Sequence, residues 1–208
     1  MTRPAVAALA VAALIAALSC ARSVRTHPGS APPAFASPFT AIVSSGIGHM
    51  RFSGVLAVAE GGLLRVEVAR GGESFLFVAG EDGTSAVLSS AALFLREGAG
   101  SRLLSELTGV GLEAEEISSA LRGAPFGLPP GCVSDAGRWR EAGEAGRLPT
   151  RVRIRCGREE LRIRLGRPEA LANGRADAAF MSLGVPPGYR QASALELAEA
   201  LREELGRR

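Results

Sequence analysis

The chain has 208 residues, of which 47% are hydrophobic, enough for one domain with a sizeable core beside a targeting segment. Its formal charge is only +3, without a concentrated basic stripe interleaved with aromatic residues, which argues against nucleic-acid binding. Two histidines occur, and no Gly-x-Ser-x-Gly, Cys-x-x-Cys or His-x-x-x-His pattern is present. This disfavours ordinary hydrolytic or metal chemistry, so we expect neither an enzyme nor a cofactor.

Residues 1–19, MTRPAVAALAVAALIAALS, carry one arginine before an apolar run that is too short to span a membrane. The run ends at Ala17-Leu18-Ser19-Cys20, which resembles a bacterial lipoprotein signal, where cleavage precedes a cysteine that is then acylated. A plain secretory signal is the alternative, and both export the chain. Ala21 in place of Asp after the cysteine favours the outer membrane under the best-known sorting rule for such lipoproteins. We therefore expect a lipid anchor at Cys20 on the outer membrane, with the domain facing the periplasm.

Residues 20–38 comprise this cysteine and a segment rich in Pro, Ser and Ala without periodicity, which predicts a flexible tether. The globular domain is expected over residues 39–208. From residue 50 the hydrophobic period becomes two. The segments GVLAVAE, LLRVEVA, ESFLFVA, TSAVLSS and ALFLREG predict an antiparallel meander with one apolar face and one solvated face.

Residues 103–125, LLSELTGVGLEAEEISSALRGAP, predict two short helices within this strand-rich chain. Gly109 ends the first helix, and Gly123 with Pro125 ends the second. Helices of about 8–10 residues are not stable alone in water, so both are expected to pack on the apolar face of the meander.

The second half returns to strands and closes with a helix. LPTRVRIRC and LRIRL alternate apolar residues with arginines, and DAAFMSLGVP predicts a further strand over 177–186. In SALELAEALREELG, leucines recur every fourth residue, and Ser193 with Glu196 predicts a capping box at the start of a C-terminal helix.

The order of these elements, with Leu107-Thr108-Gly109-Val110 followed by Leu121-Arg122-Gly123-Ala124-Pro125, resembles the LolB/LolA family of lipoprotein localisation factors over roughly residues 50–183. The resemblance implies an α+β fold, in which a curved antiparallel sheet forms an incomplete β-barrel, or half-barrel, with short helices as a lid. It also implies a function in lipid binding and protein transport. The cavity under the lid would take an acyl chain, such as palmitate, or a lipidated protein, and the carrier would be a monomer. LolB proteins carry an exposed leucine at an early turn, where this chain has Ala69-Arg70-Gly71-Gly72.

Apolar residues of the inner sheet face and of the two helices are the candidate cavity lining: Val66, Val68, Phe75, Phe77, Phe94, Leu104, Leu107, Ile117, Leu121, Val152, Ile154 and Ile163. The alternative is that these residues form a filled core, the usual fate of an apolar face. The protein would then be a non-catalytic scaffold or interaction lipoprotein of the cell envelope. A cavity of roughly several hundred Å³ beneath the helices would favour carriage.

Cys132 and Cys156 are the remaining cysteines, and in an oxidising exported setting they can form a disulfide. Cys156 shares the inward register of the neighbouring strand residues, so a buried free thiol is the open alternative. A ladder of arginines is expected on the outer face of the same hairpin, as a solvated face or a contact for anionic headgroups: Arg151, Arg153, Arg155, Arg162 and Arg164.

Overall fold

The computed structural model describes residues 34–46, 48–70, 73–80, 82–98, 102–124, 126–142, 146–171 and 183–206. The predicted signal, Cys20 and most of the predicted tether lie outside the described residues, and so does part of the turn at residues 69–72. Of the strand predicted over 177–186, residues 183–186 are described and form no strand. No helix within the described ranges is long and apolar enough to cross a membrane.

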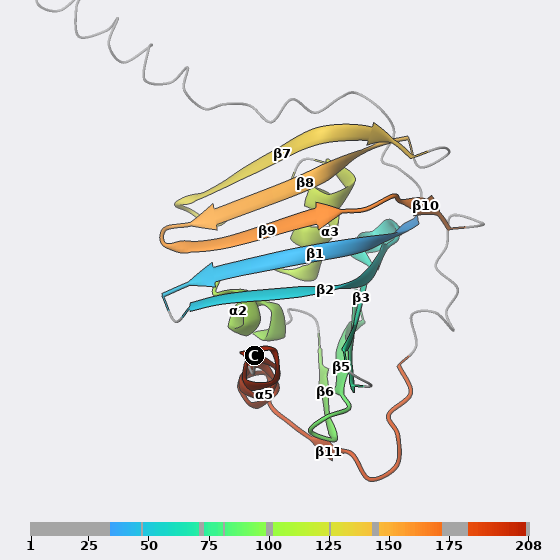
Figure 1. Ribbon diagram of the computed structural model, residues 1–208, viewed down its shortest axis with the longest axis vertical. Coiled ribbons are helices and arrows are strands. Elements are labelled where there is room, and N and C mark those ends of the chain that lie inside the picture. The colour runs from blue at the N-terminus through green and yellow to red at the C-terminus, as the bar shows by residue number, and fades with distance from the viewer. Residues whose placement is uncertain are drawn as a thin grey trace, which may run out of the picture.

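The described strands form one open, 11-stranded sheet (Figure 1). Across the sheet the order is β11 (Arg190–Gln191), β6 (Leu93–Glu97), β5 (Gly83–Leu88), β4 (Glu73–Gly80), β3 (Leu64–Arg70), β2 (Gly48–Val58), β1 (Phe35–Ser45), β9 (Glu159–Leu165), β8 (Arg147–Cys156) and β7 (Cys132–Glu141). The short β10 (Glu169–Ala170) pairs with β1 beside this path. All pairs are antiparallel except β11 with β6.

The segments with a period of two are confirmed as strands β2 to β6, β8 and β9. Two long strands, β1 and β7, were not predicted. β1 lies in the middle of the sheet, between β2 and β9, and it begins inside the predicted tether. Because Phe35 and Ser37 are buried in this strand, the prediction of a tether is wrong over residues 35–38.

The sheet bends sharply where β2 leaves β3. These strands pair only between Val55–Val58 and Leu64–Glu67, so the first half of β2 runs free of β3. Gly54 marks the point of divergence, because a Cβ there would overlap the carbonyl oxygen of Glu67. Figure 1 shows the result: the strands from β7 to β2 form one arm, and the strands from β3 to β6 turn away as a second arm.

Three α-helices lie on the concave side of the bent sheet, between the arms (Figure 1): α2 (Arg102–Thr108), α3 (Ala114–Arg122) and α5 (Ala194–Gly206). α2 packs against α5, and α3 packs against β8 and the 3-10 turn η1 (Glu60–Gly62). All three predicted helices are confirmed. The hydroxyl oxygen of Ser193 accepts a hydrogen bond of 3.2 Å from the N–H of Glu196, which is one half of the predicted capping box, while the carboxylate of Glu196 accepts hydrogen bonds from Arg190.

Candidate functional site: an apolar cavity beneath three helices

An apolar cavity of about 70 Å³ lies between the concave sheet face and the three helices. Side chains from β1, β2, β3, β4, β9, α2, α3 and α5 line it: Phe39, Ala41, Met50, Phe52, Leu56, Leu64, Val66, Val68, Phe75, Phe77, Leu104, Leu107, Thr108, Ile117, Leu121, Leu161, Ile163, Leu201 and Leu205. Thr108 is the one residue of this wall with a polar side chain, and its hydroxyl is bound to the backbone. The cavity therefore offers hydrophobic contacts and no charged or free polar group.

Most of the predicted lining residues are in this wall: Val66, Val68, Phe75, Phe77, Leu104, Leu107, Ile117, Leu121 and Ile163. Val152 and Ile154 are buried in the core and do not line the cavity. The assignment of Phe94 to the wall is wrong. Phe94 pairs with Val87 and alternates with the buried Leu93 and Leu95, so it lies on the opposite face of β6.

Sequence reasoning missed several residues of the wall, among them Met50 and Phe52 from the first half of β2. Phe39 and Ala41 come from β1, which was not predicted as a strand and begins within the predicted tether. Leu201 and Leu205 come from α5, which was predicted as a helix but not as part of the cavity. Their four-residue spacing puts both leucines on one face of the helix, and that spacing was the available signal.

The segment Leu107-Thr108-Gly109-Val110 forms the end of α2 and the start of the link to α3. The hydroxyl oxygen of Thr108 lies 2.7 Å from the carbonyl oxygen of Leu104 and accepts a 3.2 Å hydrogen bond from the N–H of Val110. Gly109 adopts a left-handed conformation with a φ of 67°, which ends the helix without steric strain. Leu107 thus points into the cavity while the backbone polar groups beside it are satisfied.

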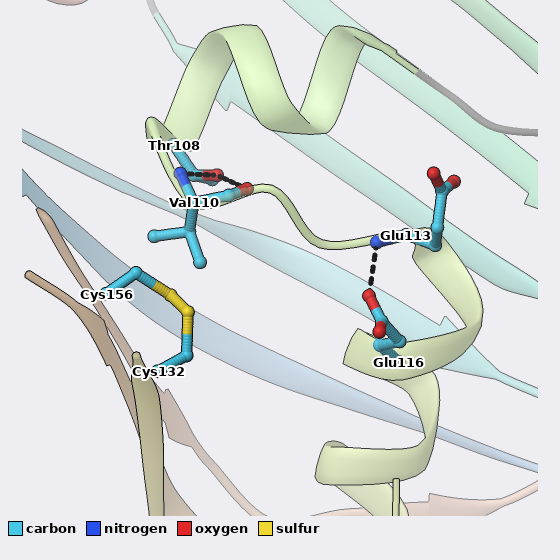
Figure 2. Close-up of a disulfide and its surroundings, with 6 residues drawn as sticks. All are labelled: Thr108, Val110, Glu113, Glu116, Cys132 and Cys156. Carbon is cyan, nitrogen blue, oxygen red and sulfur yellow. Dashed lines mark hydrogen bonds between the residues drawn. A yellow bond between two sulfur atoms is a disulfide. The ribbon is translucent and has the colours of Figure 1, made fainter. Parts of the chain in front are cut away.

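The segment Leu121-Arg122-Gly123-Ala124 ends α3 in a Schellman motif. The N–H groups of Gly123 and Ala124 donate to the carbonyl oxygens of Ala120 and Ser119. Gly123 has a φ of 69°, and a Cβ there would overlap the ring of Trp139. At the other end of α3, the carboxylate of Glu116 accepts a 2.7 Å hydrogen bond from the N–H of Glu113 (Figure 2). Both ends of this short helix are therefore fixed.

Cys132 and Cys156 form a disulfide in the structure (Figure 2). They are opposite each other in the β7–β8 register, with their Cα atoms 4.2 Å apart. Cys156 is also opposite Glu159, whose side chain lies against Gly109 in the link between α2 and α3. The disulfide thus ties the outer strand β7 to the sheet near the link between the two helices.

α2 and α5 are held together by polar contacts as well as by leucines. The guanidinium of Arg202 on α5 donates to the carbonyl oxygen of Glu106 on α2. The hydroxyl of Ser90, in the turn before β6, donates to the carboxylate of Glu204 at the far end of α5. The first bond joins the two helices to each other, and the second joins α5 to the turn before β6 of the sheet.

Most of the residues that line the cavity are buried. The wall residues that remain partly exposed are Met50, Phe52, Val66 and Leu104, and they belong to β2, β3 and α2. A volume of 70 Å³ fits the tip of an alkyl chain and not a whole fatty acyl chain. The cavity is smaller than the volume set out above as favouring carriage, and most of the concave face is filled core.

The predicted arginine ladder lies on the convex face of the arm that runs from β7 to β2, on the other side of the sheet from the cavity (Figure 1). Arg153 is opposite Arg162 in the β8–β9 register, and both donate to the carboxylate of Glu160, at 3.0 Å and 3.1 Å for the terminal nitrogens. Hydrogen bonds from Arg162 and then Arg153 lower the pKa of Glu160 to about 2. Glu160 is therefore charged at neutral pH.

Within the described residues, no three His, Cys, Asp or Glu side chains gather in a way that could hold a metal ion. His49 lies outside the cavity wall, with its Nδ1 2.9 Å from the hydroxyl oxygen of Ser44. The site thus consists of an apolar cavity and, on the other side of the sheet, a cationic surface.

No model of a known protein family matches this chain, and neither does any curated protein sequence.

Proposed function

We propose that this protein is a non-catalytic acyl-chain carrier of LolB/LolA-like fold, anchored at Cys20 in the outer membrane with its domain in the periplasm. The observation that carries the proposal is the cavity between a bent sheet and three short helices, whose wall is apolar except for Thr108 and includes four partly exposed residues. Each methylene that moves from water into such a wall contributes about 0.8 kcal/mol. Acyl chains or lipidated proteins are the ligands that this wall favours.

The mechanism we propose is displacement of the helices. The chain tip enters between Met50, Phe52 and Leu104, and α2 moves with α5 away from the sheet as the remaining methylenes follow. Leu107, Leu201 and Leu205 then exchange some of their contacts with other wall residues for contacts with the ligand. The two helices are suited to this motion because α2 is only seven residues long and the polar bonds that hold it to α5 lie within the moving pair.

A second candidate is favoured by the small volume of the cavity. In this alternative the concave face is a filled core, and the protein is a scaffold or interaction lipoprotein of the cell envelope without a ligand. The two candidates differ in whether the domain takes up an acyl chain at all.

Native mass spectrometry separates them. Residues 21–208, exported to a bacterial periplasm and purified, are incubated with a palmitoylated lipopeptide. A carrier retains a mass that matches a phospholipid, a fatty acid or the lipopeptide. A bare polypeptide mass after this incubation would reject the carrier and leave the scaffold.

The decisive variant fills the cavity without adding a charge. Ala41 lines the cavity on β1 and is 2% exposed, so Ala41→Leu places three more carbon atoms in the space that the chain tip needs. Ala170→Leu is the matched control, because Ala170 is exposed on β10 and does not line the cavity. We expect the retained mass to be lost in Ala41→Leu and kept in Ala170→Leu.

A further inference from the structure

The convex face of the arm formed by β2, β1, β9 and β8 gathers arginines from strands far apart in sequence. One row across the four strands runs from Arg51 through Ile42 and Arg162 to Arg153. In the next row, Arg164 is directly opposite Arg151. The arginine face is defined here as Arg51, Arg151, Arg153, Arg155, Arg162 and Arg164.

The positive charge of this face is only partly neutralised. Glu160 pairs with Arg153 and Arg162, and Asp135 is opposite Arg153 on β7. Arg51, Arg151, Arg155 and Arg164 are exposed and form no ion pair with any described residue. Six arginines against two carboxylates leave an excess of four positive charges, more than the formal +3 of the whole chain. The net charge of the protein is therefore concentrated on one side of one arm.

This arrangement lowers the stability of the sheet, and a bound anion would compensate it. Like charges that are directly opposite on neighbouring strands destabilise a sheet, and Arg151 opposite Arg164 is such a pair without a carboxylate between them. If this face only contacted water, side chains of mixed charge would be as soluble and would avoid the repulsion between arginines. The uncompensated pair points to a partner that brings negative charge.

Exposed apolar side chains lie on the same face. Val133 is 55% exposed and opposite Arg155 on β7, and Val55 is 48% exposed on β2, two positions after Ser53 on the same side of the strand. Ile42 lies between Arg51 and Arg162. Arginine binds phosphate oxygens through paired N–H groups. Exposed apolar side chains beside such arginines favour the region of a bilayer where the headgroups meet the acyl chains. A bilayer surface presents phosphate and hydrocarbon together.

We propose that the arginine face docks this domain on the surface of an anionic phospholipid bilayer. The docking is independent of the lipid anchor and of the cavity, which lies on the opposite face of the sheet. In the docked orientation the convex face meets the headgroups, while α2, α3 and α5 lie on the side of the sheet away from the membrane.

Flotation with lipid vesicles tests the proposal in residues 21–208, which lack the predicted acylated cysteine and keep every described strand and helix. We expect binding to vesicles of phosphatidylcholine mixed with phosphatidylglycerol, none to pure phosphatidylcholine, and release by high salt. Equal binding to both vesicles, or binding to neither, would overturn the proposal. Absence of binding would point to an acidic protein as the partner of this face.

Matched variants separate this face from general charge. Arg151→Ser with Arg164→Ser should weaken binding about 25-fold, at about fivefold for each arginine near the surface. Arg96→Ser with Arg102→Ser removes the same charge from exposed positions on β6 and α2 and should change binding less than about twofold. Glu160→Gln frees Arg153 and Arg162 and should tighten binding about fivefold. An equal loss in both double variants would contradict docking through this face, whereas the native mass measurement on the cavity is unaffected by either outcome.

Discussion

Gly54 determines where β2 leaves β3, and with it the bend that creates the concave face. A Cβ at this position would overlap the carbonyl oxygen of Glu67, a backbone atom that can move only with β3. We expect Gly54→Ala to lower the free energy of unfolding by about 2 kcal/mol or more, the range of substitutions that force strain on a strand. Urea denaturation of both proteins measures this.

Gly137→Ala is the control for the change at Gly54. Gly137 is also inside a strand, β7, but a Cβ there would have open space around it. Since alanine restricts the unfolded chain more than glycine, this variant should be neutral or slightly more stable. Equal destabilisation by both changes would show that the loss at Gly54 comes from glycine content and not from the approach to Glu67.

The ion pairs of Glu160 predict a pH dependence of stability. The pKa of this carboxyl is lowered from 4.5 to about 2 in the folded protein, by hydrogen bonds from Arg162 and Arg153. Its contribution is therefore complete above about pH 4.5, where the unfolded carboxyl is also charged, and is lost as the pH falls toward 2. We expect thermal melts of Glu160→Gln to show a lower Tm than the parent at pH 6 and a smaller difference at pH 2.5. Glu199→Gln, at an exposed position of α5, should follow the parent across this range.

At the scale of elements, the disulfide matters most for β7. This strand lies at the end of the described sheet and has no fully buried side chain, so packing alone holds it weakly. The bond between Cys132 and Cys156 closes a loop with a sequence separation of 24 residues, which corresponds to about 3 kcal/mol of loop entropy. We expect this loss of unfolding free energy on reduction, or in Cys132→Ala with Cys156→Ala. Reductant should have no effect on the double variant, and an effect there would place the reductant's action elsewhere.

The same elements show what sequence reasoning can reach. β3, β8 and β9 alternate apolar and polar residues because one face is buried and the other is wet, and that pattern predicted them. β7 lacks the pattern because neither of its faces is fully buried. β1 contains Pro38, which argues against a central strand. The structure accommodates it because β9 begins its pairing with β1 only at Phe39.

The candidate site was predictable where it follows these patterns. Residues on β3, on β4 and on the two middle helices were placed in the wall correctly, whereas Val152 and Ile154 on β8 are core residues outside it. Phe94 was assigned to the wrong face because its neighbours Leu93 and Leu95 are also apolar. When neighbouring strand residues are all apolar, the sequence does not show which of them face the core. The bend at Gly54 and the return of α5 onto α2 depend on long-range packing, which no local pattern encodes.

At the scale of the whole molecule, carriage and stability are coupled through the cavity. A ligand that binds only the folded domain raises the free energy of unfolding by about 2.7 kcal/mol when its free concentration is 100 times its Kd. We expect palmitoylated lipopeptide to raise the Tm of residues 21–208, and the same peptide without its acyl chain to leave it unchanged. The measurement is a thermal melt over a series of ligand concentrations.

Ala41→Leu should change both the Tm of the ligand-free domain and its response to the lipopeptide. Filling the 70 Å³ cavity with side-chain atoms removes an energetic cost of about 1–2 kcal/mol, so the ligand-free variant should melt at or above the parent's temperature. It should then gain nothing from the lipopeptide, because the space for the chain tip is occupied. If the ligand-free variant is stable, its loss of the response to the lipopeptide does not come from misfolding. If the variant and the parent gain equally from the lipopeptide, the acyl chain binds elsewhere, and the helices cover a core and not a carrier site.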